Sequence, residues 1–549
     1  MKFKILSLIT ALLISFGCAF GLTACNEVSI KSAEINANGE LIITMTDGTT
    51  TNLGKVTGAD GEDGEDGVNG SDGAPGAPGA DGEDGKDGVG IATAYIDENG
   101  RLIIVLTSGE RIDCGKVSGG AEAPALNYSE ADGGYVVTGI TDASVSALQI
   151  PATYNGKPVT GIAEEAFAGS NLVSVSLPDG VTAIGARAFA DCSELKSITV
   201  GKGVKTVGAA AFARCSALSA VNITDIGAWC GIAFAAASSN PLYFAHTLYL
   251  KNAVVTEINL PDSVTAIADY AFYGCDKLVG VNAGNGATSI GKGAFYGCSS
   301  LERVAIGAAE TIGEEAFADC VKLDALNLGS KLKSIGGFAF NRCEELVEIS
   351  FPSTLEDVGE NAFAECRKLK TVGLNEGLKT IGDGAFCGCP LIESFIMPDS
   401  VVSLGFGVLM NIPGGGFDSP TGEVSMLSEL RISNSLTEIP DYAFSKTVIK
   451  RAVIGNSVVK INYSSFFGCA SLESLVIPVS VKHIASYSFY KCDSLQTVYY
   501  EGTEDQWRGV FVGKNGNDIH NAQIYFYSPA KPSVDGQYWH YVDGVPAVW

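Results

Sequence analysis

The chain is organised around Ile184-Gly185-Ala186-Arg187-Ala188-Phe189-Ala190-Asp191-Cys192-Ser193-Glu194-Leu195. The pattern of this stretch, I-G-x-x-A-F-x-x-C-x-x-L, returns along most of the sequence, usually after 22 or 23 residues. The Phe position of the pattern is filled by Phe167, Phe189, Phe212, Phe272, Phe295, Phe317, Phe340, Phe363, Phe386, Phe444, Phe466 and Phe489, and once by Leu409. A fixed period of this length predicts a solenoid, in which each copy forms one rung of a stack.

Each copy predicts the same local structure. After the Cys position comes L-x-x-V-x-L-P, as in Leu172, Val175, Leu177 and Pro178, and its alternation predicts a short strand with one buried face. The next segment, V-T-x-I-G, predicts a second short extended piece and a turn, and A-F-x-x-C predicts one helical turn. A single rung cannot bury its own apolar side chains, so we expect the stacked rungs to share one core.

The repeat resembles the BspA-like leucine-rich repeats of bacterial and protist surface proteins. The resemblance covers about residues 125–549 and rests on the many copies in register. It implies an extracellular solenoid of short strands and short helical turns. Several members of that family are associated with adhesion to host proteins or to other cells, so the resemblance also implies a binding role.

The N-terminus predicts a lipid anchor. Lys2 and Lys4 precede an apolar run from residue 5 to residue 20, as in a signal peptide. The run ends in Leu22-Thr23-Ala24-Cys25, which resembles the bacterial lipobox. In such signals the thiol receives a diacylglycerol and the preceding peptide is removed, so residues 1–24 are the predicted signal peptide and Cys25 the predicted lipidation site. The alternative is an ordinary secretory signal with an incidental cysteine.

A stem separates the anchor from the repeats. Residues 33–58 recur as residues 94–119 at a constant offset of 61. Asn-Gly pairs between β-rich runs favour hairpins, so each copy predicts a small three-stranded β-meander. These two modules occupy residues 25–57 and 91–120.

A collagen-like tract at residues 58–90 joins the two modules. Gly occupies every third position from Gly58 to Gly88, as a triple helix requires, but Pro occurs only at Pro75 and Pro78. Acidic residues dominate the tract, and three such strands would repel one another. Two arrangements stay open here, a homotrimer through the Gly-x-y tract and a monomeric stalk, and either one spaces the solenoid away from the membrane.

The predicted solenoid spans residues 121–527, and a capping hairpin follows at residues 528–549. Inserts at 224–254 and 411–426 interrupt the repeat. Inserts on solenoids often mark the binding face, although a tolerated surface loop is the simpler interpretation. The candidate binding loop lies in the second insert and consists of Gly414, Gly415, Gly416, Phe417 and Asp418.

The residues that could carry chemistry favour a structural role. Ten of the 15 cysteines share one repeat position, which predicts a ladder of buried thiols. Zinc is the alternative, but the chain lacks C-x-x-C pairs. The four histidines form no recognisable pair or triad with Ser, Cys or Asp. We therefore expect no catalytic residue, cofactor or metal, and an enzyme is the interpretation that the sequence supports least.

The charge of the chain limits its partners. There are 62 acidic and 36 basic residues, giving a net charge of −26, which argues against nucleic acid and against charge-driven binding to anionic lipids. We expect a lipoprotein on the extracellular face of the bacterial membrane that binds a host matrix protein, a glycan or another surface protein. The alternative is a structural component of the envelope that contacts neighbouring surface proteins.

Overall fold

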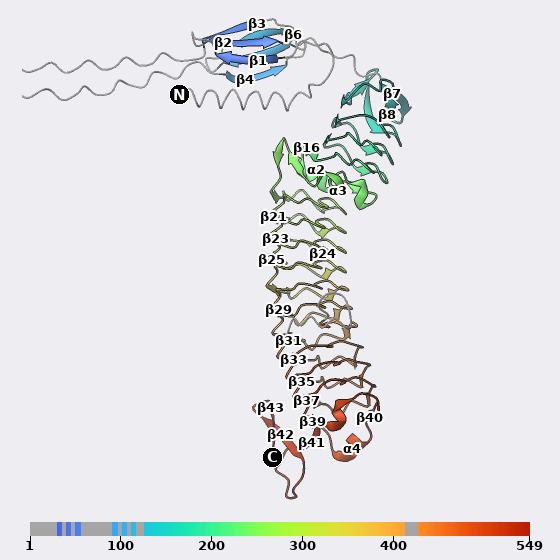
Figure 1. Cartoon of the computed structure of the whole chain (residues 1–549), viewed down its shortest axis with the longest axis vertical. Helices are drawn as coiled ribbons and strands as arrows, with labels where there is room; N and C mark the ends of the chain where they lie inside the picture. Colours follow the sequence, from blue (N-terminus) through green and yellow to red (C-terminus); the bar gives the residue numbers. More distant parts are fainter. Residues whose placement is uncertain are drawn as a thin grey trace, which may run out of the picture. The chain divides into compact units, whose positions relative to one another are not determined.

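The computed structural model describes residues 126–411 and 426–549, and the backbone of six strands that precede them in the sequence (Figure 1). The predicted signal peptide, Cys25, the Gly-x-y tract and the candidate binding loop lie outside the described residues.

The six N-terminal strands form two antiparallel sheets of three strands. Their bounds are β1 Ile30–Ile35, β2 Glu40–Met45, β3 Thr50–Lys55, β4 Ile91–Ile96, β5 Arg101–Leu106 and β6 Arg111–Lys116. The two sheets share one register, since Ile35 pairs with Leu41 in the first and Ile96 pairs with Leu102 in the second. The sequence repeat at an offset of 61 is thus also a repeat in strand pairing.

Most rungs of the solenoid contribute two short strands, and strands of successive rungs pair in parallel to form two ladders, each divided into several sheets (Figure 1). The V-x-L segments form β12 Ser174–Ser176, β14 Ser197–Val200, β16 Ala220–Ile223, β18 Leu248–Leu250, β20 Glu257–Asn259, β21 Gly280–Asn282, β23 Arg303–Ala305, β25 Ala325–Asn327, β27 Glu348–Ser350, β29 Thr371–Gly373, β31 Ser394–Ile396, β33 Glu429–Arg431, β35 Arg451–Val453, β37 Ser474–Ile477, β39 Thr497–Tyr500 and β41 Gln523–Tyr527. Pairing is in register from rung to rung, as in Val175 with Ile198.

The second ladder comes from the I-G segments. Its strands are β11 Lys157–Ile162, β13 Ala183–Ile184, β15 Thr206–Val207, β17 Ala233–Phe234, β22 Ser289–Ile290, β24 Thr311–Ile312, β26 Ser334–Ile335, β28 Asp357–Val358, β30 Thr380–Ile381, β32 Ser403–Leu404, β34 Glu438–Ile439, β36 Lys460–Ile461, β38 His483–Ile484 and β40 Phe511–Val512. At the N-terminal end, β7 (Leu126–Ala131) and β8 (Gly134–Ile140) extend this ladder, and β10 (Thr153–Tyr154) pairs with β11. β9 (Ala147–Gln149) lies between β8 and β10 in the sequence.

Glycine follows the isoleucine of this ladder because the rungs stack too closely for a side chain. A Cβ built on Gly336 would lie 2.6 Å from the backbone nitrogen of Glu314 in the preceding rung. Such a contact is below van der Waals distance, so most rungs keep glycine here.

The phenylalanines of the repeat stack on one another in the core, except at the first insert and at Leu409. Phe295, Phe317 and Phe340 are fully buried, and neighbouring rings are 5.1 and 5.2 Å apart and nearly parallel. This offset stacking is a favoured arrangement of aromatic rings. The predicted shared core is confirmed, because most rungs place the same side chains above those of the rung before.

The prediction of a helical turn in the A-F-x-x-C segment is wrong. In the rung of Phe317, the residues two positions before and after it, Glu315 and Asp319, have φ angles of +57° and +60°. The N–H of Phe317 donates to the carbonyl of Ala339 in the next rung, 2.7 Å away. Left-handed residues stop a helix from continuing, so the segment is a pair of tight turns whose main hydrogen bonds run between rungs.

The insert at 224–254 forms a rung of its own. It contains α2 Ile226–Cys230, η1 Ala237–Ser239, α3 Leu242–Ala245 and β19 Ala253–Val254, besides β17 and β18. β17 pairs with β15 and β18 with β16, so both ladders extend into the insert, where these two sheets end. Trp229 is buried, and its Nε1 donates to the carbonyl of Ala271 at 2.8 Å. This insert therefore continues the core, and it is not a loop added to the surface.

A similar arrangement ends the chain. α4 (Glu504–Arg508) and η2 (Asp518–Asn521) precede β41, and a hairpin of β42 (Tyr538–Val542) and β43 (Val545–Val548) follows it. Trp539 of β42 is fully buried and donates from Nε1 to the carbonyl of Tyr500, 2.9 Å away. The hairpin thereby covers the last rung. None of the helices in the described part of the chain is long and apolar enough to cross a membrane.

Candidate functional site

The V-x-L ladder presents one face of the solenoid, called here the strand face. The sequence predicts ten outward positions on it, and all ten are half-buried or exposed: Ser197, Thr199, Asn222, Arg303, Asn327, Glu348, Ser350, Thr371, Ser474 and Tyr499. Charged side chains on this face pair across rungs, as Arg303 does with Glu257 at 2.7 Å. A hollow of about 340 Å³ lies between β29 and β31, where Arg431 and Asp399 are 3.6 Å apart.

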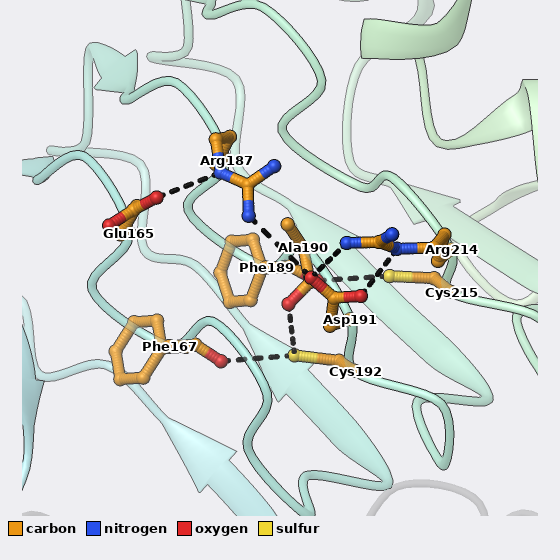
Figure 2. Close-up of polar contacts among 9 residues, drawn as sticks. All are labelled: Glu165, Phe167, Arg187, Phe189, Ala190, Asp191, Cys192, Arg214 and Cys215. Atoms are coloured by element: carbon orange, nitrogen blue, oxygen red, sulfur yellow. Dashed lines mark hydrogen bonds and ion pairs between the residues drawn. The ribbon is translucent and has the colours of Figure 1, made fainter.

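The A-F-x-x-C segments present a second face, called here the turn face. In the first rungs this face is occupied by ion pairs of the chain itself (Figure 2). Arg187 lies 2.8 Å from Glu165 and 3.6 Å from Asp191, and Arg214 donates to Asp191 at 2.8 Å. The hydrogen bond from Arg214 lowers the pKa of the Asp191 carboxyl. Since these charges already have partners, this part of the face offers little for a ligand.

The ladder cysteines lie directly beneath the turn face. Nine of the ten thiols donate to the carbonyl oxygen of the Phe one rung earlier, as Cys192 does to Phe167 and Cys215 to Phe189 (Figure 2). Burial raises the pKa of Cys275 to about 12 and that of Cys320 further. Thiols of this kind are poor nucleophiles.

The described residues contain no disulfide and no group of three or more His, Cys, Asp or Glu side chains that could hold a metal ion. The cysteine ladder is therefore part of the core packing.

The C-terminal half of the turn face carries a cluster of aromatic side chains, called here the aromatic stripe. It consists of Phe406, Tyr442, Tyr463, Tyr487, Tyr490 and Phe467. The first four lie on four successive rungs, and their ring centroids are 5.4, 5.8 and 5.6 Å apart. Tyr490 contacts Tyr487 at 5.6 Å and Phe467 at 5.7 Å. The rings are tilted or edge-to-face, so no two of them lie flat against each other.

Three members of the aromatic stripe are exposed to solvent, and Tyr442, Tyr487 and Phe467 are half-buried. Phe406, Tyr463 and Tyr490 are 40%, 43% and 37% exposed. The ammonium group of Lys491 lies over the rings of Tyr490 and Phe467, 5.7 and 6.0 Å from their centroids. Large exposed apolar side chains in one contiguous patch are characteristic of binding surfaces.

A second tyrosine group on the turn face is arranged differently. Tyr273 and Tyr296 stack at 4.8 Å with an angle of 8° between their planes, and Tyr243 stacks on Tyr273 at 5.5 Å. Their flat faces are therefore covered by one another. Hydrogen bonding to Asp319 and burial raise the pKa of Tyr296 to about 12.

The second insert begins beside the aromatic stripe. The N–H of Asn411 donates to the carbonyl of Ser445 in the next rung at 3.0 Å. The N–H of Ser445 in turn donates to the carbonyl of Tyr442, a member of the aromatic stripe, at 3.0 Å. At the other end of the insert, the N–H of Met426 donates to the carbonyl of Pro390 at 2.7 Å. The candidate loop of residues 414–418 lies outside the described residues, so the structure leaves its role untested.

Sequence reasoning missed the aromatic stripe because its members do not share one repeat position. Phe406 and Tyr463 stand three residues before the Phe position, Tyr442 and Tyr487 two before it, and Phe467 and Tyr490 one after it. Comparing all positions of the turn segment, and not only the strand positions, would have revealed an excess of aromatic residues in these rungs.

Comparison with known proteins agrees with the repeat. A family model described as BspA type leucine rich repeat region matches residues 144–240, 245–310, 307–413 and 423–511. The chain belongs to this family. The matched residues include the rungs on either side of both inserts, and they do not include the N-terminal modules. No curated protein matches the chain.

The chain is also similar to several proteins of known structure. A leucine-rich repeat protein from Bacteroides ovatus is 23% identical over 73% of this chain and 98% of its own, with a TM-score of 0.45. A leucine-rich cell surface protein from Faecalibacterium prausnitzii is 24% identical over 77% and 98%, with a TM-score of 0.36. The pneumococcal vaccine antigen PcpA is 16% identical over 78% and 98%, with a TM-score of 0.39.

Proposed function

We propose that this BspA-type protein is a bacterial surface lipoprotein whose solenoid binds a partner outside the cell through the aromatic stripe. The observation that carries the proposal is the exposure of Phe406, Tyr463 and Tyr490 on consecutive or nearby rungs of a hydrogen-bonded scaffold. Aromatic side chains dominate binding energy at interfaces because they bury much area at little entropic cost.

The scaffold supports this function through its stiffness. Strands β33, β35, β37 and β39 pair in register, and the turn segments are bonded rung to rung, as Phe444 is to Ser465 at 2.8 Å. A stripe fixed on such a frame loses little conformational freedom when a partner binds.

The order of segments supports the location. A predicted lipid anchor at Cys25 comes first, the stem modules and the Gly-x-y tract follow, and the solenoid comes last. That order suits a binding domain displayed away from the membrane. The proposed partners are a host matrix protein, a glycan or another surface protein.

A binding array tests this function. Full-length protein in detergent micelles would be applied to matrix proteins, to glycans and to envelope proteins of the producing cell. We expect capture by a matrix protein or a glycan. Capture by the cell's own envelope proteins alone would instead support a structural role in the envelope, and a folded protein that binds nothing in any set would refute the proposal.

A further inference from the structure

We propose that the aromatic stripe binds a neutral, extended, 1,4-linked polysaccharide that lies along the direction in which the rungs stack. The inference rests on the proposed function and names the class of partner. It follows from the spacing of the rings, from the polar groups beside them and from the local balance of charge.

The spacing of the rings suits a polymer with a short repeat. Phe406, Tyr442, Tyr463 and Tyr487 follow one another at 5.4, 5.8 and 5.6 Å, one ring for each rung. These distances are comparable to the advance of one pyranose residue in an extended 1,4-linked chain. Successive sugars can therefore meet successive rings. Because neighbouring ring planes differ by 55–63°, the C–H groups of the sugars would pack against the face of some rings and the edge of others.

An extended peptide matches the rings less well. Side chains on one side of a β-strand recur every two residues, about 6.6 to 6.8 Å apart. Over the three intervals from Phe406 to Tyr487, this period would drift by about 3 Å from the ring positions. A peptide could contact one or two of the rings in register, but not all four.

Polar groups that can form hydrogen bonds with sugar hydroxyls lie beside the rings. The exposed carboxylate of Asp441 accepts from the backbone N–H of Tyr463 through Oδ1 at 2.8 Å. Among the described residues, no hydrogen bond to its second oxygen is found. At the other end of the stripe, Lys491 supplies an ammonium donor above Tyr490 and Phe467. Acceptor and donor groups next to aromatic faces suit a ligand made of hydroxyls and C–H surfaces.

The charge of this region favours a neutral ligand. Residues 426–527 contain nine acidic and nine basic side chains, whereas the whole chain carries a net charge of −26. These residues include every member of the stripe except Phe406, so most of the stripe lies on a part of the chain with balanced charge. A polyanion would be repelled by the rest of the molecule, and a polycation would lack a local anionic patch to bind.

Affinity electrophoresis tests the inference. Full-length protein in mild detergent would run through native gels that contain hydroxyethylcellulose, a neutral 1,4-linked glucan, or polygalacturonate, an acidic 1,4-linked polymer. We expect retardation by the neutral polymer only. Tyr463→Ala and Tyr487→Ala should each lower the affinity about two- to tenfold, because one aromatic contact is worth about 0.5–1.5 kcal/mol.

Tyr243→Ala is the matched control. Tyr243 is 39% exposed on the same face but belongs to the stacked tyrosine group, so its removal should leave retardation unchanged. Circular dichroism melts of all variants would verify that the solenoid stays folded. Unchanged retardation in both stripe variants, equal loss in the control, or retardation by polygalacturonate alone would each overturn the inference.

The outcomes also separate this inference from the proposed function. If the stripe variants lose capture of a matrix protein on the array while no neutral glycan retards the wild type, the stripe binds protein and only the polysaccharide is wrong. If the wild type is not retarded by the neutral polymer and also binds nothing on the array, both the polysaccharide inference and the proposed function are wrong.

Discussion

The Sγ atom of Cys320 lies 3.3 Å from the carbonyl oxygen of Phe295, one rung earlier in the stack. The ring of Phe295 in turn stacks on that of Phe317, which belongs to the rung of Cys320. Two neighbouring rungs are thus joined by two contacts: the thiol of one bonds to a backbone carbonyl of the other, and their phenylalanine rings stack in the core. The hydroxyl side chains of Ser170 and Thr447 occupy the cysteine position elsewhere, and each contacts the cysteine of the next rung.

We predict that alkaline pH unfolds the solenoid. Burial raises the pKa of the ladder thiol Cys275 and of Cys230 in the first insert to about 12, and it also strongly raises the pKa of the ladder thiols Cys298 and Cys320. Above about pH 8.5, thiols of the unfolded chain ionise while the buried ones do not, so each lowers the free energy of unfolding by about 1.4 kcal/mol per pH unit. Stability should be full below about pH 8 and fall steeply between about pH 9 and 12.

Urea denaturation at several pH values, followed by circular dichroism, would measure this dependence. Cys275→Ala should make the alkaline decline shallower while lowering stability at neutral pH. An unfolding midpoint that stays constant up to pH 11 would contradict the prediction.

We predict that Phe340→Ala strongly destabilises the solenoid and Phe340→Leu does so much less. Phe340 is fully buried and stacks on Phe317 at 5.2 Å and Phe363 at 5.1 Å. Truncating a buried phenylalanine costs about 3 to 5 kcal/mol, whereas a hydrophobic swap of similar volume usually costs less than about 1.5 kcal/mol. Leu409 already fills this position in one rung. If urea denaturation showed that both substitutions lower the free energy of unfolding equally, the volume of the side chain at this position would not determine stability, and the prediction would be wrong.

We predict that the second insert can be removed without unfolding the solenoid. The rungs on either side pair directly, with Ser394 opposite Glu429 and the N–H of Leu409 donating to Ala443 at 2.9 Å. Deleting residues 412–425 and joining the ends through a short Gly-Ser linker should therefore leave the melting curve nearly unchanged. Because the insert begins beside the aromatic stripe, binding to the partner captured by the wild type should drop.

The control for this deletion is an insert of unchanged length in which every residue is Gly or Ser. If that variant binds fully and the deletion does not, the length of the insert matters and the candidate loop of residues 414–418 does not. Full binding by both variants would restrict the contact to the described rungs.

We predict that Cys25→Ala releases the protein from the membrane. Only a thiol at this position can receive the diacylglycerol, so the variant should lose labelling by a clickable fatty acid and appear in detergent-free medium. Cys18→Ala, in the predicted signal peptide, is the matched control and should keep both label and anchoring. Label that persists in the Cys25 variant would show that the lipobox interpretation is wrong.

The sequence by itself determined the architecture of the repeat region. Phe317, Cys320 and the leucine that follows, Leu323, recur at one spacing, and a fixed spacing puts each of them above its counterpart in the previous rung. A core built in this way needs no long-range information, because every rung meets the same neighbours. The outward strand positions followed from the same alternation.

Only the tertiary structure decided the form of the turns, the nature of the first insert and the aromatic stripe. Glu315 and Asp319 become left-handed because their own amides and that of Phe317 bond to the next rung, a partner that local sequence does not reveal. Trp229 enters the core because two strands of its insert pair with the rung before. The rings of Tyr463 and Tyr487 come from different repeat positions, and they meet because stacked turns place those positions side by side.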